Sequence, residues 1–558
     1  MNGLVEMVWK RIYLFFFLML FFNSVSAYQH DQSKVEFLDY SPEILKEYAN
    51  GEKPLFLLFS AEWCHWCKVL ESKTLREEKV YQYLNRHFVN IFIDADIHNG
   101  IYLKYRATGV PYTVFLNPDQ SVYFKYSGVL YAEDFLEVIR GVQENVAVGK
   151  SLYVDDEELD AYLPPKEFNL AKLESLHQLL NDGVLDNIDW KHAGLGQGQK
   201  TIHPQLSLYL LENSSVEDQE EHLEWIIPSL EQAIRHLYDS LEGGFYRYAE
   251  TREWEVAHFE KMADLNAGMV ALLQKVNQLR PTPEFEKTAE QTLKYLVKTL
   301  YSEELGVFLS FQEADTFYYF LNAEGRSQGK TPEVIQRIFT DRLSRTLLQL
   351  MAIEGIPGSF QLDQKILSSL DFLASMVIRE KQIYHFYDMQ NGQWETPGGL
   401  EDLALLSVVF AEAAKKYRKP HYLHALKKLH QLAREKNYNR DLQIFSDHNL
   451  NPEDDLEFHL EMNAWLALSF IENPRATDQD EKIIRDIFFD NLCTITLLRE
   501  MQHFHCQQID HSAERFRNMW RPCPDRNLYR NWIRSKSLAD FGQHILEVRT
   551  LTIHLIDE

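Results

Sequence analysis

Between residues 34 and 148 the chain alternates short apolar runs with longer windows whose apolar positions recur every three to four residues. The runs at 54–59, 89–94, 112–116 and 121–126 predict strands. The windows at 68–88, with a break, and at 132–144 predict helices. The expected order is β-α-β-α-β-β-α, which is typical of a compact α/β domain.

After residue 165 the pattern becomes helical almost throughout. Amphipathic windows lie at 222–241, 262–279, 285–301, 332–352, 364–378, 399–417, 422–436 and 458–471. Four acidic residues at 155–158, followed by Pro164 and Pro165, indicate a linker. We find no repeat of fixed period, which disfavours solenoids with a strong consensus but not a toroid of paired helices. We predict a domain at 28–150, a linker at 151–165, a helical domain at 166–475 and a C-terminal helical extension at 476–558.

The first 27 residues resemble a secretory signal peptide in their charge and polarity. Lys10 and Arg11 precede an apolar stretch at 12–22, and the segment ends at Ala27 in a small-x-small pattern. The stretch is too short for a transmembrane helix, which needs about 20 apolar residues. We expect cleavage after Ala27, no stable membrane insertion, and export to the periplasm or the medium.

The charge balance narrows the classes of partner. Of 558 residues, 83 are acidic and 57 basic, and the net charge of −26 repels nucleic-acid phosphates.

Five cysteines are too few to hold a chain of this length together through disulfides. Two of them form one Cys-x-x-Cys, and the odd number left, Cys493, Cys506 and Cys523, excludes complete internal pairing.

The sequence from Trp63 to Cys67, Trp-Cys-His-Trp-Cys, stands between a predicted strand and a predicted helix. A cysteine at the start of a helix is stabilised as a thiolate by the backbone N–H groups and the helix dipole. We therefore expect Cys64 to be the exposed, attacking thiol and Cys67 to resolve the mixed disulfide. His65, when protonated, would favour the thiolate. A zinc half-site is the alternative, but only His65 and His87 are local candidates for further ligands.

The segment 34–148 resembles the thioredoxin fold through Ala61-Glu62-Trp63-Cys64 with Cys67-Lys68, and through Gly109-Val110-Pro111. The resemblance implies supporting roles for Glu62, Trp63, His65, Trp66 and Pro111, the last as a cis proline that docks an extended partner chain. Thioredoxins carry a buried aspartate on the strand before the motif, whereas this chain has Leu58. Deprotonation of Cys67 would need another group, such as Glu62 or a water.

A wider resemblance covers most of residues 40–470. It is carried by Cys64-His65-Trp66-Cys67, by 243–248 through 258–262, and by Pro397-Gly398-Gly399-Leu400-Glu401-Asp402. These segments are similar to the thioredoxin-domain group that includes the bacterial YyaL type and the spermatogenesis-associated proteins. The resemblance implies a multidomain α+β protein: a thioredoxin-like α/β domain followed by a mostly helical (α/α)6 toroid like that of N-acylglucosamine 2-epimerases.

The helical part carries a second group of candidate residues. They are polar or aromatic side chains that would suit a sugar ring and its hydroxyls: Arg247, Trp254, His258, Glu260, Asp264, Asp315 and Asp402. His258 could act as a general base, with a carboxylate such as Glu260 as orienter or acid. The alternative is a binding or structural pocket, because such clusters commonly fix loop packing.

Other motifs do not point to a cofactor or a metal. The glycines at 194–198 lack a preceding strand and the spacing of a nucleotide-binding loop, and 503–506 with Cys523 matches no standard zinc pattern. Three hypotheses follow. The first is an exported thiol–disulfide oxidoreductase whose toroid binds a target protein or glycan and which a redox partner recycles. The second is a sugar epimerase or other glycan-acting enzyme in the toroid with an accessory thioredoxin domain. The third is a non-catalytic binding scaffold.

Overall fold

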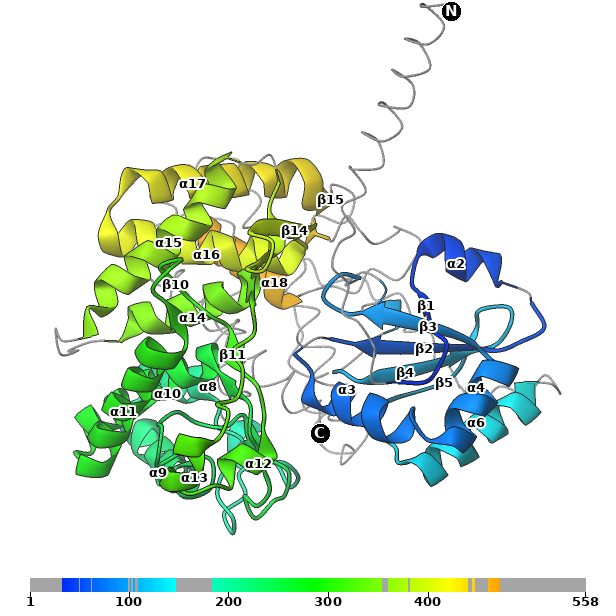
Figure 1. The fold of residues 1–558 in the computed structure, drawn as a ribbon. Coiled ribbons are helices and arrows are strands. Elements are labelled where there is room, and N and C mark those ends of the chain that lie inside the picture. The colour runs from blue at the N-terminus through cyan, green and yellow to red at the C-terminus, as the bar shows by residue number, and fades with distance from the viewer. Residues whose placement is uncertain are drawn as a thin grey trace, which may run out of the picture. The chain divides into compact units, whose positions relative to one another are not determined.

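The computed structural model describes residues 33–49, 51–61, 63–98, 101, 104–105, 109–146, 183–353, 360–379, 382–439, 444–446 and 460–471. The chain divides into two compact units at residues 157 and 158, and each is described by itself (Figure 1). The predicted signal peptide, linker and C-terminal extension, with its three cysteines, lie outside the described residues. Within the described part, no helix has both the length and the apolar character needed to cross a membrane.

The first unit is a five-stranded mixed sheet covered by helices (Figure 1). Its elements are β1 (Leu38–Asp39), α2 (Pro42–Glu47), β2 (Leu55–Ser60), α3 (His65–Val69), the π-helix η1 (Leu70–Thr74), α4 (Glu78–His87), β3 (Val89–Asp94), β4 (Tyr112–Leu116), β5 (Val122–Ser127) and α6 (Ala132–Val146). The strand order is β1-β3-β2-β4-β5, with β1 and β2 parallel to β3 and with β4 antiparallel to its neighbours. This topology confirms the predicted thioredoxin-like α/β domain.

Strand β2 is the central strand of the sheet, and every residue in it is buried. Alternate side chains point to opposite faces of a strand. Phe56 and Leu58 accordingly pack into one core cluster, and Leu55, Leu57 and Phe59 into the other. The chain leaves this strand at Ser60, directly before the cysteine motif, so a rigid element fixes the start of that motif.

The second unit consists mainly of paired helices. These are α8 (Pro204–Asn213), α9 (Val216–His236), α10 (Ala263–Leu279), α11 (Pro283–Thr299), α12 (Thr316–Tyr319), α13 (Ala323–Gln328), α14 (Thr340–Ala352), α15 (Leu362–Arg379), α16 (Leu400–Tyr417), α17 (Pro420–Leu432), the π-helix η3 (Ala433–Asn437) and α18 (Leu460–Ile471). Helices α8, α10, α14, α16 and α18 contact one another in succession, and α9, α11, α15 and α17 each pack on an inner helix. The predicted mostly helical domain of paired helices is thus confirmed within the described residues.

Short antiparallel strands connect the helix pairs, which the sequence did not predict. They are β6 (Tyr248–Ala249), β7 (Ala257–His258), β8 (Lys261–Met262), β9 (Tyr301–Ser302), β10 (Val307–Phe308), β11 (Phe311–Gln312), β12 (Arg337–Phe339), β13 (Tyr384–Asp388), β14 (Gln393–Pro397), β15 (Tyr438–Asn439) and β16 (Ile444–Phe445). Apart from β13 and β14, which have five residues each, they are two or three residues long and carry too little alternation to be recognised in a sequence. They matter because they position side chains at the N-terminal ends of inner helices.

The structure also reveals a recurring turn, although the sequence shows no fixed period. Asp189, Asp239, Ser302 and Asp388 each accept a hydrogen bond from a backbone N–H two or three residues further on. A glycine with positive φ follows each of them, at 194, at 243 and 244, at 306 and at 392. Insertions of different length separate the turns, which hides the repeat from a search for fixed spacing.

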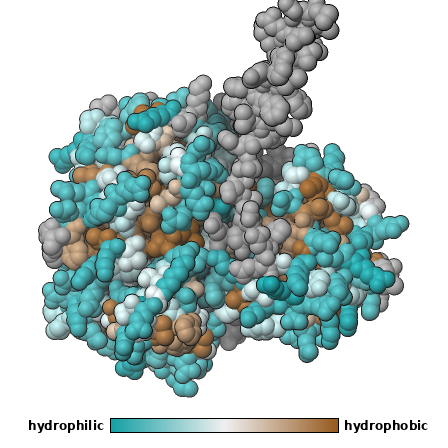
Figure 2. Space-filling model, viewed as in Figure 1, coloured by the Kyte–Doolittle hydropathy of each residue, from teal (hydrophilic) through white to brown (hydrophobic). Residues whose placement is uncertain are grey.

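One surface feature of the second unit is apolar. Phe317 and Phe320 of the α12 region are 78% and 77% exposed. Figure 2 shows hydrophobic side chains at the surface in this region, surrounded by polar ones. Phe320 packs edge to face on Phe259, at 5.4 Å between ring centroids.

Candidate functional site

The two cysteines of the motif form a disulfide at the start of α3. The bond joins Cys64 and Cys67, with an S–S distance of 2.10 Å. Cys64 is the N-cap, and its Sγ accepts a hydrogen bond from the backbone N–H of Cys67 at 3.0 Å. The predicted placement of the first cysteine at a helix N-terminus thus holds. Such N–H groups stabilise a thiolate when the bridge is reduced.

The bridge lies beneath an apolar cover rather than open to solvent. Cys64 is only 3% exposed and Cys67 is fully buried, and both pack with Trp63, Trp66 and Val110. The expected exposure of the Cys64 sulfur is therefore wrong for this disulfide form, because the two tryptophans and the valine surround it. The Val110 carbonyl oxygen lies 3.3 Å from Cys64 Sγ.

The residues that were expected to support the motif have distinct positions. Trp63 donates from Nε1 to both carboxylate oxygens of Asp96, at 3.1 and 3.2 Å, which fixes its ring. His65 is the first residue of α3 and meets Trp66 edge to face. The peptide bond before Pro111 is cis, as expected. Glu62 lies outside the described residues.

A buried carboxyl group near the motif escaped the sequence analysis. Glu71 is 0% exposed and stands four residues after Cys67, where α3 passes into η1. Its Oε1 accepts a hydrogen bond from the hydroxyl of Ser60, the last residue of β2, at 3.3 Å. The signal was present, since Cys67, Leu70, Glu71 and Thr74 follow the i, i+3, i+4, i+7 spacing of a buried helix face. Glu71 is thus a buried acidic group four residues after Cys67, in contact with the end of β2.

In the second unit, three of the predicted pocket residues come together. The hairpin β6–β7 pairs Tyr248 with His258, and their rings stack at 4.8 Å. Arg247 Nη1 lies 3.0 Å from Glu260 Oε2, and His258 Nδ1 lies 3.7 Å from the same oxygen. His258 and Glu260 are 5% and 1% exposed, so Arg247 is the solvent-facing member of this group.

The structure places the other predicted pocket residues elsewhere. Trp254 is 1% exposed and donates from Nε1 to the His192 carbonyl, so its ring packs a loop and offers no face to a sugar. Asp315 caps α12 by accepting from the Tyr318 N–H, which is a structural role. Asp264 is an ion-pair partner of Arg342, at 3.3 Å. Trp254 and Asp315 thus have structural roles, whereas Asp264 lies beside Arg342.

The segment 243–262, singled out for its glycines and aromatics, is built around a buried lysine. Lys261 is fully buried and its Nζ lies 2.7 Å from Asp239 Oδ2, which Arg326 also contacts at 2.7 Å. The Lys261 ammonium lies 4.7 Å from the ring centroid of Tyr295, at cation–π distance. Burial lowers the pKa of Lys261 to about 8, although Asp239 opposes the shift. This cluster explains the motif as a structural anchor.

The lowered pKa of Lys261 predicts a pH dependence of stability. The unfolded chain binds a proton on this lysine up to its ordinary pKa, whereas the folded chain releases it near pH 8. Stability rises with pH wherever the unfolded state binds more protons. The free energy of unfolding of the native protein, relative to Lys261→Met, should therefore increase between about pH 7 and about pH 9.5. Urea unfolding of both proteins at the two pH values measures this difference in free energy of unfolding. A difference that stays constant or falls as the pH rises contradicts the lowered pKa of Lys261.

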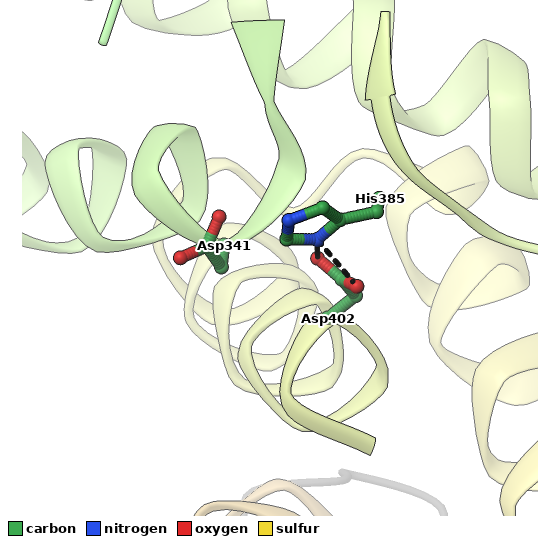
Figure 3. Close-up of side chains that lie close together, drawn as sticks. All are labelled: Asp341, His385 and Asp402. Atoms are coloured by element: carbon green, nitrogen blue, oxygen red, sulfur yellow. Dashed lines mark hydrogen bonds and ion pairs between the residues drawn. The ribbon is translucent and has the colours of Figure 1, made fainter. Parts of the chain in front are cut away.

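Asp402 belongs to a different group, with two residues that the sequence analysis missed. His385 Nδ1 lies 3.0 and 3.1 Å from the Asp402 carboxylate oxygens, and Asp341 lies beside this pair (Figure 3). Burial raises the pKa of Asp402 to about 6; Asp341 adds to the rise and His385 opposes it. No local motif marks His385, because only strand pairing brings it to the helix starts.

Comparisons with known proteins agree with the thioredoxin-like fold of the first unit. The family model Thioredox_DsbH, described as "Protein of unknown function, DUF255", matches residues 20–151. Spermatogenesis-associated protein 20 of Rattus norvegicus is 24% identical over 329 residues, covering 53% of this chain and 41% of that protein. This chain is therefore similar in sequence to proteins of this type, and the match to the family model lies on its thioredoxin-like unit. It spans about two fifths of the length of the first curated relatives it matches.

Two further similarities concern the separate units of the chain. Thiol:disulfide interchange protein DsbD of Campylobacter jejuni strain RM1221 is 27% identical over 122 residues, which are 21% of each chain. Among solved structures, a sugar epimerase from a ruminal bacterium aligns with a TM-score of 0.45 and 10% identity, over 57% of this chain and 85% of that chain. The first unit is thus a redox-related thioredoxin-like domain.

Proposed function

We propose that this protein is an exported thiol–disulfide oxidoreductase that exchanges disulfides through Cys64 and Cys67. The observation that carries the proposal is the Cys64–Cys67 bridge at the N-terminal end of α3, beside the Val110 backbone, on a thioredoxin-like sheet. A dithiol in this position has a thiolate stabilised by backbone N–H groups and a second cysteine within reach.

The exchange conserves atoms and electrons. In the reduced protein, the Cys64 thiolate attacks one sulfur of a partner disulfide, forms a mixed disulfide and releases the other partner sulfur as a thiolate. The Cys67 thiolate then attacks Cys64 Sγ, restores the bridge and releases the first partner sulfur as a thiolate. Two electrons pass from the dithiol to the partner, and the reverse sequence oxidises a partner dithiol.

Trapping of the intermediate tests this function. In Cys67→Ala the resolving thiolate is missing, so mixed disulfides should accumulate through Cys64 when the reduced variant is mixed with an oxidising extract. Non-reducing electrophoresis followed by reduction releases the partners. The double variant Cys64→Ser, Cys67→Ala is the control, because it has no attacking thiol. Equal amounts of adduct with both variants, or none with either, would contradict the proposal.

Glu71 is proposed as the group that accepts the proton of Cys67. General-base assistance contributes on the order of 10²-fold or more, so Glu71→Gln should slow release of the partner from the mixed disulfide by about that factor. First attack by Cys64 should change far less, which separates this role from a general loss of structure. Stopped-flow kinetics with a fluorescent disulfide peptide resolves the two steps. Glu77→Gln, an exposed carboxyl on the same segment, is the matched control and should leave both steps unchanged.

For the toroid we propose that it binds the target protein or a glycan on it, while an external redox partner recycles the dithiol. The rival hypothesis makes the toroid a glycan-acting enzyme in which His258 is the base, supported by its approach to Glu260 at 3.7 Å. It predicts that His258→Ala abolishes turnover of a saccharide that Cys64→Ser, Cys67→Ser retains. The oxidoreductase hypothesis predicts that Cys64→Ser, Cys67→Ser abolishes disulfide exchange and that His258→Ala retains it.

The scaffold hypothesis treats the bridge as permanent. Structural disulfides of exported proteins have reduction potentials below about −300 mV, whereas exchange-active ones lie higher. Equilibration of the Cys64–Cys67 pair with glutathione buffers, followed by alkylation and mass spectrometry, gives its potential. A value below that limit would favour an inert bridge and contradict the proposed function.

A further inference from the structure

The three-stranded sheet β12-β13-β14 brings together the starts of two inner helices. Phe339, the last residue of β12, pairs with Phe386 of β13, and the next residue, Thr340, donates to the Tyr384 carbonyl at 2.7 Å. Helix α14 begins at Thr340, so Asp341 in its first turn comes beside His385. Strand β14 pairs with β13 and leads into α16, whose first turn carries Asp402.

These three side chains form a compact set of metal-ligating atoms. One ligand atom from each of Asp341, His385 and Asp402 lies within 4.8 Å of the other two. Figure 3 shows the imidazole of His385 between the two carboxyl groups. The Asp341 side chain is 9% exposed, that of Asp402 3% and that of His385 17%, so the set is largely removed from bulk water but open on the histidine side.

One of these ligand atoms lacks a partner. Within the part of the chain that the structure describes, Asp341 Oδ1 is buried and has no hydrogen-bond partner. Its other oxygen, Oδ2, lies 3.5 Å from Arg342 Nε. An unsatisfied buried polar atom is destabilising by about 1–3 kcal/mol, and more for a charged group. By contrast, Asp402 is held by the Gly399 N–H at 3.0 Å as well as by His385. Asp341 Oδ1 is therefore the buried ligand atom of the set that is available to a cation.

The charges around the set leave a cation to be supplied. The neighbouring cations are Arg342 and Arg345, and each has another acidic partner. Arg342 is shared with Asp264 on α10 at 3.3 Å, and Arg345 lies 3.0 Å from Glu401. The set itself holds two buried carboxyl groups and an imidazole, and buried acidic groups of this kind are commonly paired with a cation or coordinate a metal.

We propose that Asp341, His385 and Asp402 bind a divalent transition-metal cation. Carboxylate oxygens with an imidazole nitrogen suit Mn²⁺ or Zn²⁺. Three protein ligands leave coordination positions for water or for an oxygen-rich ligand such as a sugar or a carboxylate. The site lies wholly within the second unit and is independent of the cysteine chemistry. Composition and spacing predicted no metal, since the three residues lie on separate elements.

Titration of the full-length protein with Mn²⁺ tests the site. Mn²⁺ is the probe because it prefers oxygen and imidazole to thiolates, so the cysteines compete little. Loss of the electron paramagnetic resonance signal of the free aqueous ion reports bound metal. We expect saturable binding, and we expect Asp341→Asn and His385→Gln each to weaken the affinity at least about tenfold.

Asp371→Asn is the matched control. Asp371 pairs with His421 at 2.8 Å in an exposed aspartate–histidine pair, and Asp371→Asn should bind Mn²⁺ as the native protein does. Circular dichroism of each variant verifies folding; if Asp341→Asn is unfolded, His385→Gln decides, because it changes a strand residue and leaves the helix start intact. Absence of saturable binding, or binding that both site variants retain unchanged, would overturn the proposal.

Discussion

Cys64→Ser should abolish catalysed disulfide exchange while leaving the fold of the first unit intact. Serine preserves the size of the side chain and its capping of α3, since a hydroxyl oxygen also accepts from the Cys67 N–H. It cannot form a disulfide with a partner. Reduction of insulin disulfides with dithiothreitol as the electron source measures turnover. The rate with Cys64→Ser should fall from that of the native protein to that of the uncatalysed reaction.

Cys493→Ser is the control for this experiment, because it removes a cysteine outside the motif. Its rate should equal that of the native protein. Retention of turnover in Cys64→Ser, or its loss in Cys493→Ser, would move the reactive thiol away from the motif. The asymmetry between Cys64 and Cys67 follows from position, since the first caps the helix and the second is fully buried.

Asp239→Ala should destabilise the second unit by about 3–5 kcal/mol, the range for removing one partner of a buried ion pair. Asp239 is 3% exposed and is shared by Lys261 and Arg326, each at 2.7 Å. Its loss leaves a fully buried ammonium group without its carboxylate. The same side chain accepts from the Leu241 N–H and so also shapes the recurring turn. Urea unfolding followed by circular dichroism measures the change.

An exposed ion pair provides the comparison. Lys330 and Glu333 are 82% and 64% exposed, and pairs of this kind contribute about 0–1 kcal/mol. Glu333→Ala should therefore cost less than 1 kcal/mol. Equal effects of Asp239→Ala and Glu333→Ala would show that the buried cluster is not the anchor of the 243–262 segment.

The strands and helices that keep one pattern of apolar residues over their whole length could be predicted from the sequence. The strands β2, β3, β4 and β5 lie within one residue of the ranges expected from apolar runs. Helices α10, α15, α16 and α18 begin and end within two residues of their expected windows. The window expected for α14 starts eight residues before the helix and ends with it, because the apolar residues Val334, Ile335, Ile338 and Phe339 precede the helix.

Functional residues were predictable only where their chemistry is local. The cysteine pair and its helix form one continuous motif, so residue types and spacing were sufficient. Glu71 was missed because its burial depends on the packing of the α3–η1 segment against the sheet, where it meets Ser60 of β2. His385 and Asp341 were missed because they lie 44 positions apart in the numbering and meet only through pairing of β12 with β13.

By itself, the sequence determined that the chain has a thioredoxin-like domain with a Cys-x-x-Cys at a helix start and a second, helical part. The thioredoxin likeness follows from the resemblance of its motifs, and the helical part follows from local periodicity. The tertiary structure decided that the disulfide is covered by tryptophans, that Lys261 is a structural anchor, and that Asp402 joins His385 and Asp341 instead of His258. Those outcomes depend on contacts between segments far apart in the chain, and on the free energy of burying charges there, which no local pattern records.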